Sequence, residues 1–304
     1  AFALCDANGA PDRTFGDDGI QLVRLPGELS MGTRDSWLPP GVPGIEACDF
    51  AVQEDGRILL IANHHFSLAD HAGMLIRLCP DGSLDESFNG RGFVMVRHLL
   101  LNTWLSTLLL KGDGRIVVAG SIDFPQQGLL AVYQSDGRLD ERFAVDGFMA
   151  FRAHGNSAQV SQIIESADRL YCFGSSRDPS RCLTFVLHGN GRPDLHCHHG
   201  QPQVVDIGPS GCQWNAARLM SDGRIVAVGA TIGGVEADFM VARYQADGSL
   251  DPAFGQGHGW LRTRLGRSLD TANSLAVQTD GAIVVGGYSL DGNYRAMVAR
   301  YLNP

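Results

Sequence analysis

One turn-rich phrase recurs along the chain about every 55 residues, and this repetition constrains the fold more than any other feature. The phrase reads IRLCPDGSLDESFNGRG from residue 76, AVYQSDGRLDERFAVDG from residue 131 and ARYQADGSLDPAFGQGHG from residue 242. Each complete unit contains an apolar strand, an Asp-Gly turn, a second strand, a variable loop, a third strand, a second turn and a last strand. A chain that repeats one unit in this way is expected to stack similar structural modules.

Two glycine-containing turns separate the strands of each unit. Asp-Gly and Asn-Gly pairs adopt the positive backbone dihedral angles of tight hairpins, so each turn is expected to join two antiparallel strands. The flanking segments are rich in Val, Ile, Leu and Phe, which is typical of buried strands, and helical periodicity is essentially absent. The first turn of the unit recurs at Asp55-Gly56, Asp113-Gly114, Asp222-Gly223 and Asp280-Gly281.

Three further kinds of residue recur at fixed places. A glycine closes the second strand, where we expect a bend or a close approach of two backbones. In the LDxxF phrase, the aspartate is expected to cap nearby amides and the phenylalanine to fill the seam between units. These residues are Gly120, Gly174, Gly229 and Gly287; Asp85, Asp140 and Asp251; and Phe15, Phe88, Phe143 and Phe254.

Four antiparallel strands per repeat predict an all-β fold, a five-bladed β-propeller that forms a single domain over residues 1–304. Its sequence repeats, which are the expected blades, span approximately 1–44 (partial), 45–101, 102–156, 157–211, 212–269 and 270–304 (partial). The last unit lacks a fourth strand, and FGDDGIQLVRL (15–25) can provide it, so the N- and C-terminal segments are expected to close the ring. One strand of the kind that comes third in each repeat unit has no place in this five-bladed count. Six blades, or a fragment of a longer array, therefore stay open as alternatives.

The stretches NSLAVQTDGAIVVGGYS (273–289) and FMVARYQADGSLDPAFG (239–255) resemble the bacterial delta-60 repeat, a β-propeller repeat family. The resemblance covers almost the whole chain and implies a propeller fold. Because most members of this family have no assigned function, it does not imply an activity.

Composition excludes several classes of partner. The net charge of −9 argues against nucleic acid and anionic membranes, because both attract basic surfaces. The longest apolar runs, such as HLLLNTWLSTLLL (98–110), are too short and too interrupted for a membrane span. The seven cysteines are odd in number and lack CxxC spacing, so no disulfide framework is expected, although one or two bridges stay open. No cofactor is predicted.

Sequence variation collects in loops that an up-and-down strand order brings to one face, whereas the Asp-Gly turns share the other face. These loops include NHHFSLADHAG (63–73), SIDFPQQG (121–128) and the long connection over residues 26–46. Loops on a rigid scaffold often carry binding residues, so we predict the ligand site on the variable-loop face. Unconstrained drift of the loops is the alternative.

Aromatic and amide residues near this face suit a sugar. Trp faces can stack on the C–H faces of sugar rings while amides bind the hydroxyls, although packing between blades explains a Trp equally well. The candidate ligand-binding residues are Trp37, Trp104, Gln213, Trp214 and Asn215.

A histidine-rich variable loop offers a second type of site. His64, His65, Asp70 and His71 could bind a metal or supply a general base, or they could belong to a solvated polar loop. The other histidine-rich stretch, LHCHHG (195–200), is interpreted as a degenerate copy of the repeated turn.

Common catalytic signatures, such as GxSxG, HExxH and the P-loop, are missing from the sequence. We therefore predict a non-enzymatic binding module that recognises a glycan or a protein on the variable-loop face. The alternatives are a carbohydrate-active hydrolase or lyase with its site in the central funnel, and a purely structural repeat of a larger surface protein. These functions favour an extracellular or cell-surface location over a cytoplasmic one.

Overall fold

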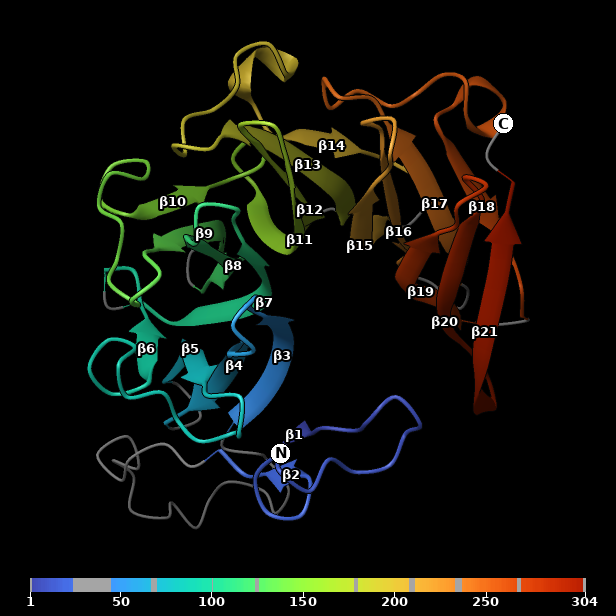
Figure 1. Ribbon diagram of the computed structural model, residues 1–304. Coiled ribbons are helices and arrows are strands. Elements are labelled where there is room, and N and C mark those ends of the chain that lie inside the picture. The colour runs from blue at the N-terminus through green and yellow to red at the C-terminus, as the bar shows by residue number, and fades with distance from the viewer. Residues whose placement is uncertain are drawn as a thin grey trace. The chain divides into compact units, whose positions relative to one another are not determined.

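The fold was analysed in a computed structural model of the 304-residue chain. It describes residues 2–23, 45–66, 70–99, 101–123, 126–177, 180–207, 211–232, 237–266 and 269–302. The chain divides into two compact units: unit 1 comprises Ala1–Phe124 and Leu130–Glu141, and unit 2 comprises Pro125–Leu129 and Arg142–Pro304. The described regular structure is β-strand apart from two short 3-10 helices, which confirms the prediction of an all-β fold (Figure 1). Among the described residues no helix is long and apolar enough to cross a membrane.

Unit 1 contains a small N-terminal sheet and the first sheet with the strand order of a blade. The small sheet pairs β1 (Phe2–Ala3) with β2 (Ile20–Gln21). The four-stranded sheet has the order β3-β4-β5-β6, and its strands are β3 (Ile45–Val52), β4 (Ile58–His65), β5 (His71–Leu78) and β6 (Phe93–Val96).

The next four-stranded sheet has the order β10-β9-β8-β7, and the division between the two units passes through β9. Its strands are β7 (Thr103–Leu110), β8 (Ile116–Ile122), β9 (Gln127–Tyr133) and β10 (Phe148–Phe151).

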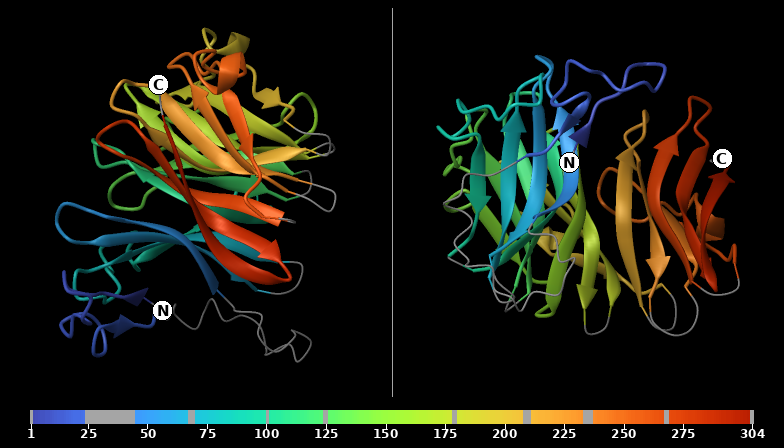
Figure 2. Two further views of the ribbon diagram at one scale, coloured as in Figure 1. Left: turned by 90° about the vertical axis from the view of Figure 1, so that its right-hand side faces the viewer. Right: turned by 90° about the horizontal axis from the view of Figure 1, so that it is seen from below.

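Unit 2 contains three further sheets whose strands pair in sequence order, as the hairpin turns predict (Figure 2). The first holds β11 (Ser157–Ser166), β12 (Arg169–Arg177), β13 (Arg181–His188) and β14 (Gln203–Val205). The second holds β15 (Cys212–Leu219), β16 (Ile225–Thr231), β17 (Phe239–Tyr244) and β18 (Trp260–Thr263). The third holds β19 (Leu269–Val277), β20 (Ile283–Asp291) and β21 (Asn293–Tyr301). The helices are η2 (His198–Gly200) and η3 (Gly255–Gly257). Five sheets therefore have the strand pattern of blades, and the last has three strands in the described residues.

The repeated turns form as their sequences predict. In the turn between β15 and β16, Gly223 has a φ of +84°, a value that glycine adopts without strain. Asp222 accepts a hydrogen bond of 3.0 Å from the Arg224 N–H, which fixes the turn. This chemistry explains why Asp-Gly recurs at the tips of the hairpins.

The glycines that end the second strands allow two backbones to approach closely. The first strand of each of the five sheets contains a β-bulge, for example between Trp214 and Ala216. A Cβ atom on Gly229 would lie only 1.9 Å from the carbonyl oxygen of Gln213, and one on Gly120 would lie 1.8 Å from that of Trp104. The predicted close approach at these positions is confirmed.

The phenylalanine of the LDxxF phrase packs beneath the second turn of the following repeat. Phe88 is fully buried, and a Cβ atom on Gly137 would lie 3.0 Å from its ring. The Asn89 N–H donates to the Asp136 carbonyl over 2.7 Å and holds the two segments together. In unit 2, Cys197 occupies the equivalent place and is also buried, so LHCHHG is a degenerate copy of the turn.

The aspartate of the LDxxF phrase caps an amide as expected and also makes ion pairs that were not predicted. Asp251 Oδ2 lies 2.7 Å from Arg243 Nε and 3.2 Å from Arg224 Nη1, and the Arg243 side chain has no exposed surface. In unit 1, Asp85 pairs with Arg77 and Arg57 at 2.7 and 3.2 Å. A buried carboxylate between two guanidinium groups thus occurs in two copies of the repeat.

The N-terminal segment pairs differently from the prediction. Residues 15–25 were expected to add a fourth strand to the last sheet, but β2 pairs with β1, with Ala3 opposite Ile20. The strand left over in the sequence count is either FALC (2–5) or VARY (298–301), and FALC, which contains β1, supplies the partner of β2. A local pairing across fewer than 20 residues costs less loop-closure entropy than one that spans the chain. The closed ring is therefore not shown.

Candidate functional site

Two histidines face each other where the β4–β5 hairpin reaches its variable loop. His65 is the last residue of β4 and His71 the first residue of β5, and the antiparallel register places them directly opposite each other. Their ring centroids are 5.3 Å apart. The hairpin thus places two imidazoles, each with hydrogen-bonding nitrogens, side by side at the ends of the two inner strands of the sheet.

A tryptophan from the next sheet completes a three-ring cluster. Trp104 is the second residue of β7, and its ring centroid lies 5.7 Å from that of His65 and 5.9 Å from that of His71. The rings meet edge to face, and all three side chains are partly exposed. His65, His71 and Trp104 are called the His–Trp cluster below.

An aspartate orients one of the imidazoles. Asp123 follows the last residue of β8, and its Oδ2 lies 3.0 Å from His71 Nε2. The backbone is fixed as well, because the Asp123 N–H donates to the Asn102 carbonyl over 3.0 Å. The side chains of His71 and Asp123 are 12% and 28% exposed, so solvent and a ligand can reach the pair. Asp123 was not predicted as a site residue, although it lies in the variable loop SIDFPQQG.

The other two residues of the predicted metal set, Asp70 and His64, contact other side chains. Asp70 is paired with Arg97, whose guanidinium carbon lies 5.3 Å from the centroid of the Phe66 ring. His64 packs edge to face against Phe66 at 4.6 Å. In the described part of the chain, no group of three or more His, Cys, Asp or Glu residues could hold a metal ion. The metal, general-base and polar-loop interpretations of this loop stay predictions, and of its four residues only His65 and His71 face each other.

Trp214, predicted to contact a ligand, is fully buried in unit 2 and packs edge to face against Tyr244 at 6.2 Å. The register explains the difference from Trp104. Trp214 pairs with Gly229, whereas it is Leu105 that pairs with the equivalent Gly120. Because side chains alternate between the two faces of a strand, an offset of one residue turns Trp214 into the core. Its ligand-binding role is replaced by a packing role.

The two predicted amide residues form a hydrogen-bonded row in unit 2. Gln213 Nε2 donates to Asn215 Oδ1 over 2.8 Å, and Asn215 Nδ2 donates to the Ala272 carbonyl over 2.8 Å. Asn215 Nδ2 also lies 3.3 Å from Asn273 Oδ1, which adds a residue that the sequence did not single out. These amides support one another, and Trp214 does not share their exposed side. Trp37 lies outside the described residues.

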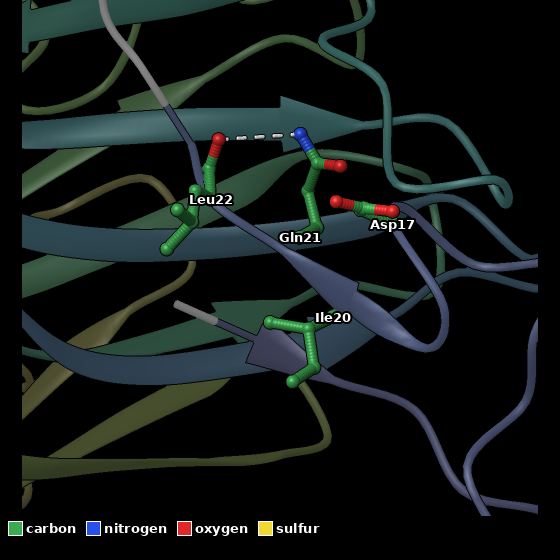
Figure 3. A pocket seen from close by; sticks show the side chains of 4 residues that line it. All are labelled: Asp17, Ile20, Gln21 and Leu22. Atoms are coloured by element: carbon green, nitrogen blue, oxygen red, sulfur yellow. Dashed lines mark hydrogen bonds between the residues drawn. The ribbon is translucent and has the colours of Figure 1, made fainter.

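Two open pockets lie away from the His–Trp cluster. One, of about 390 Å³, lies beside β2 and is lined by Asp17, Ile20, Gln21 and Leu22 (Figure 3). Gln21 Nε2 donates to the Leu22 carbonyl over 3.3 Å, while Ile20 and Leu22 leave apolar surface exposed. The other, of about 460 Å³, lies at two Asp-Gly turns and is lined by Gln53, Glu54, Asp55, Leu110, Lys111, Gly112 and Gly114.

Comparisons with known proteins support a β-propeller repeat family. Residues 221–254 match the family described as a domain of unknown function (DUF5122) β-propeller. The comparison with curated protein sequences gives no match.

Solved structures with a similar fold include several proteins that act on carbohydrates. A polysaccharide lyase of family PL25, an ulvan lyase bound to a GlcA(1-4)Rha3S saccharide, is 9% identical with a TM-score of 0.53. The similarity covers 83% of this chain and 66% of the lyase, slightly less than two thirds of its length. A hypothetical protein from Leishmania major is 11% identical with a TM-score of 0.43, and 87% and 88% of the two chains are covered. A GH74 xyloglucanase from Xanthomonas campestris is 13% identical with a TM-score of 0.45, over 84% of this chain and 36% of the enzyme. At these identities the likeness concerns the fold alone.

Proposed function

We propose that the chain is a non-enzymatic recognition module that binds a glycan at the His–Trp cluster. The observation that carries this proposal is the position of Trp104 beside His65 and His71, with Asp123 3.0 Å from His71. An indole ring offers an apolar surface to the C–H face of a sugar, and the imidazole nitrogens and the carboxylate offer donors and acceptors to its hydroxyls. The ulvan lyase of similar fold binds a saccharide, which is compatible with a glycan ligand here.

Trp104→Ala tests the site directly. We expect it to weaken binding of a glycan selected on an array by about tenfold or more, because a stacked aromatic anchor contributes about 1.5–3 kcal/mol when it is buried by a ligand. Isothermal titration calorimetry with the selected glycan measures the change. Trp260→Ala is the matched control, since Trp260 also lies beside a histidine, His258, at 5.7 Å, but in unit 2. Equal losses in both variants, or binding of a protein and no glycan, would overturn the proposal.

The runner-up function is a carbohydrate-active hydrolase or lyase, and the His71–Asp123 pair is the observation that favours it. A carboxylate that accepts from Nε2 leaves Nδ1 available as a proton acceptor, which is the arrangement of a general base. His71→Asn would then abolish turnover of a polysaccharide while binding persists. Wild-type protein that binds glycans but releases no reducing ends or unsaturated products would exclude this alternative. Absence of any ligand would favour a structural role in a larger surface protein.

The finer fold assignment belongs to the same proposal: a single domain of delta-60 repeats in a five-bladed ring that the N- and C-terminal segments close. One observation supports it. Val298 of β21 is 74% exposed, whereas Val241, at the equivalent register position of β17, is fully buried. A neighbouring blade would cover such a face. An experimental structure with six blades, or with an open array, would reject the five-bladed ring.

A further inference from the structure

Two thiols from neighbouring sheets of unit 2 lie next to each other in the core. Cys182 is the second residue of β13 and Cys212 the first residue of β15, and neither has exposed surface. The Cys182 N–H donates to Cys212 Sγ over 3.1 Å, and Cys212 Sγ–H donates to the Val205 carbonyl over 3.2 Å. The sulfur of Cys212 therefore links the third and fourth strands of one sheet to the first strand of the next.

The equivalent junction in unit 1 makes the same link without sulfur. There the Gly73 N–H donates to Thr103 Oγ1 over 3.0 Å, and the Thr103 hydroxyl donates to the Val96 carbonyl. The registers match, because Gly73 pairs with Val96 as Cys182 pairs with Val205. This hydrogen-bonded link requires one side-chain atom on the first strand of the following sheet that both accepts and donates a hydrogen bond. It requires no side chain on the third strand, where Gly73 has none. The thiol of Cys182 is additional to it.

The two thiols differ in acidity in the way that a reactive pair requires. A hydrogen bond from the Cys182 thiol, helped by the N–H groups of Ile207 and Cys182, lowers the pKa of Cys212 against the effect of burial. Burial, followed by the interaction with Cys212, raises the pKa of Cys182 well above its ordinary value. Cys212 is therefore the more acidic of the two thiols and is the one that loses its proton first.

We propose that Cys182 and Cys212 are a redox-active pair that forms a reversible disulfide between β13 and β15 on reaction with hydrogen peroxide. Cys212 gives up its proton and the resulting thiolate attacks one peroxide oxygen, the O–O bond breaks, and the departing hydroxide takes up that proton as water, which leaves Cys212 as a sulfenic acid. The Cys182 sulfur then attacks the Cys212 sulfur, the S–O bond breaks, and the Cys182 proton leaves with the hydroxide as a second water. Two thiols lose two electrons and the peroxide gains them, and a dithiol reductant reverses the reaction.

The consequence is a covalent bond between two sheets that only packing and hydrogen bonds otherwise join. A disulfide restricts the unfolded chain, so the oxidised protein should unfold at a higher temperature than the reduced protein. Hydrogen peroxide is hardly larger than water, so local opening of the junction is sufficient for its entry.

Peptide mapping tests the proposal. The protein is treated with hydrogen peroxide, its remaining thiols are alkylated under denaturing conditions, and it is digested without reductant. Trypsin alone leaves residues 182–218 in one peptide, because Arg192 precedes Pro193. A second protease that cleaves before Asp194 and Asp206 separates this stretch into three peptides with one cysteine each.

The expected product links the Cys182 and Cys212 peptides, whereas the Cys197 peptide is alkylated. Cys197 is an internal control, because burial raises its pKa to about 11 and Asp194 faces it. Treatment with dithiothreitol should restore two alkylatable thiols. Recovery of Cys182 and Cys212 both alkylated after oxidation, or a link from either of them to Cys197, would overturn the proposal.

Two variants copy the sulfur-free junction and separate chemistry from folding. Cys212→Thr reproduces Thr103 and keeps the hydrogen bonds, and Cys182→Gly reproduces Gly73. Both should fold and should show no difference in melting temperature between oxidised and reduced samples, while the wild type shows one. Because glycan binding is assigned to unit 1, failure of this proposal would leave the proposed function untouched.

Discussion

Asp251→Ala should destabilise unit 2 by about 3–5 kcal/mol, because it removes the carboxylate from a guanidinium that is buried in the protein. Arg243 has no exposed surface and its Nε lies 2.7 Å from Asp251 Oδ2, while Arg224 approaches the same oxygen at 3.2 Å. Removal of one partner of a buried ion pair leaves the other charge uncompensated, which is why the expected cost is large. Chemical denaturation followed by circular dichroism measures the change.

Two further variants separate the buried charge from a general effect of losing an aspartate. The double variant Asp251→Ala, Arg243→Leu should recover part of the loss, because it leaves no charge in the core at this position. Asp247→Ala is the surface control: this exposed turn aspartate accepts from the Ser249 N–H at 2.9 Å, and its loss should cost about 1 kcal/mol. A double variant that is no more stable than Asp251→Ala would contradict the buried-charge explanation.

The same carboxyl predicts how stability depends on pH. Burial opposes ionisation of Asp251, but hydrogen bonds from the Ala253 N–H, Arg224 and Arg243 outweigh it and lower the pKa below its ordinary value. Since the unfolded pKa is about 3.9, the contribution is complete above that pH and is lost as pH falls through the folded pKa. In unit 1, burial opposes ionisation of Asp85, but hydrogen bonds from the Ser87 hydroxyl and from Arg77 outweigh it and lower the pKa of this carboxyl, so unit 1 should also lose stability at low pH.

The fold could be predicted from the sequence to the extent that its determinants are local. Asp-Gly pairs specify hairpins within a few residues, and the repeat places those hairpins at equal intervals, so strand number and pairing inside each sheet followed directly. The partner of β2 could not be predicted. The segment of β2 resembles the fourth strand of a repeat unit, and two segments, those of β1 and β21, resemble the third strand with which it should pair. The repeats therefore identify the blades, but they do not show which strand pairs with β2 in the N-terminal segment.

The candidate site could be predicted only in part, because it combines segments that are distant in sequence. The density of histidines in a variable loop singled out His65 and His71, and Trp104 was singled out by its residue type. Asp123 lies 52 positions after His71 in the sequence, and only the packing of one sheet on the next brings them together. The buried pairing of Arg243 with Asp251 was missed for a related reason: both residues were visible in the repeat, but the repeat does not say which polar residues point inward.

The two tryptophans show how one residue of register decides between packing and binding. Trp214 pairs with the strand-ending glycine Gly229, whereas Trp104 pairs with Ser121, one position beyond the equivalent glycine, so the two indoles lie on opposite faces of equivalent strands. In the sequence the two tryptophans stand at nearly equivalent places, each near the start of a first strand of the repeat. Their different burial gives a prediction that separates the two roles.

Trp214→Ala should cost about 3–5 kcal/mol of stability, because it empties the volume of a fully buried indole. Trp214 packs against Tyr244 and belongs to a core that also contains Phe173, Cys212 and Met240. Unfolding should be followed by far-ultraviolet circular dichroism, since removal of a tryptophan alters the fluorescence itself. Trp214→Phe should restore part of the loss by refilling some of the cavity.

Trp104→Ala is the matched control, since it removes the same side chain from a partly exposed position. It should cost less than half as much stability as Trp214→Ala, because the truncated side chain leaves no enclosed cavity. The effects on binding should be reversed: under native conditions Trp214→Ala should retain the glycan affinity of the His–Trp cluster, and Trp104→Ala should lose it. If Trp214→Ala were as stable as wild type, the packing role would fail; if it lost binding while folded, the assignment of the ligand to Trp104 would fail.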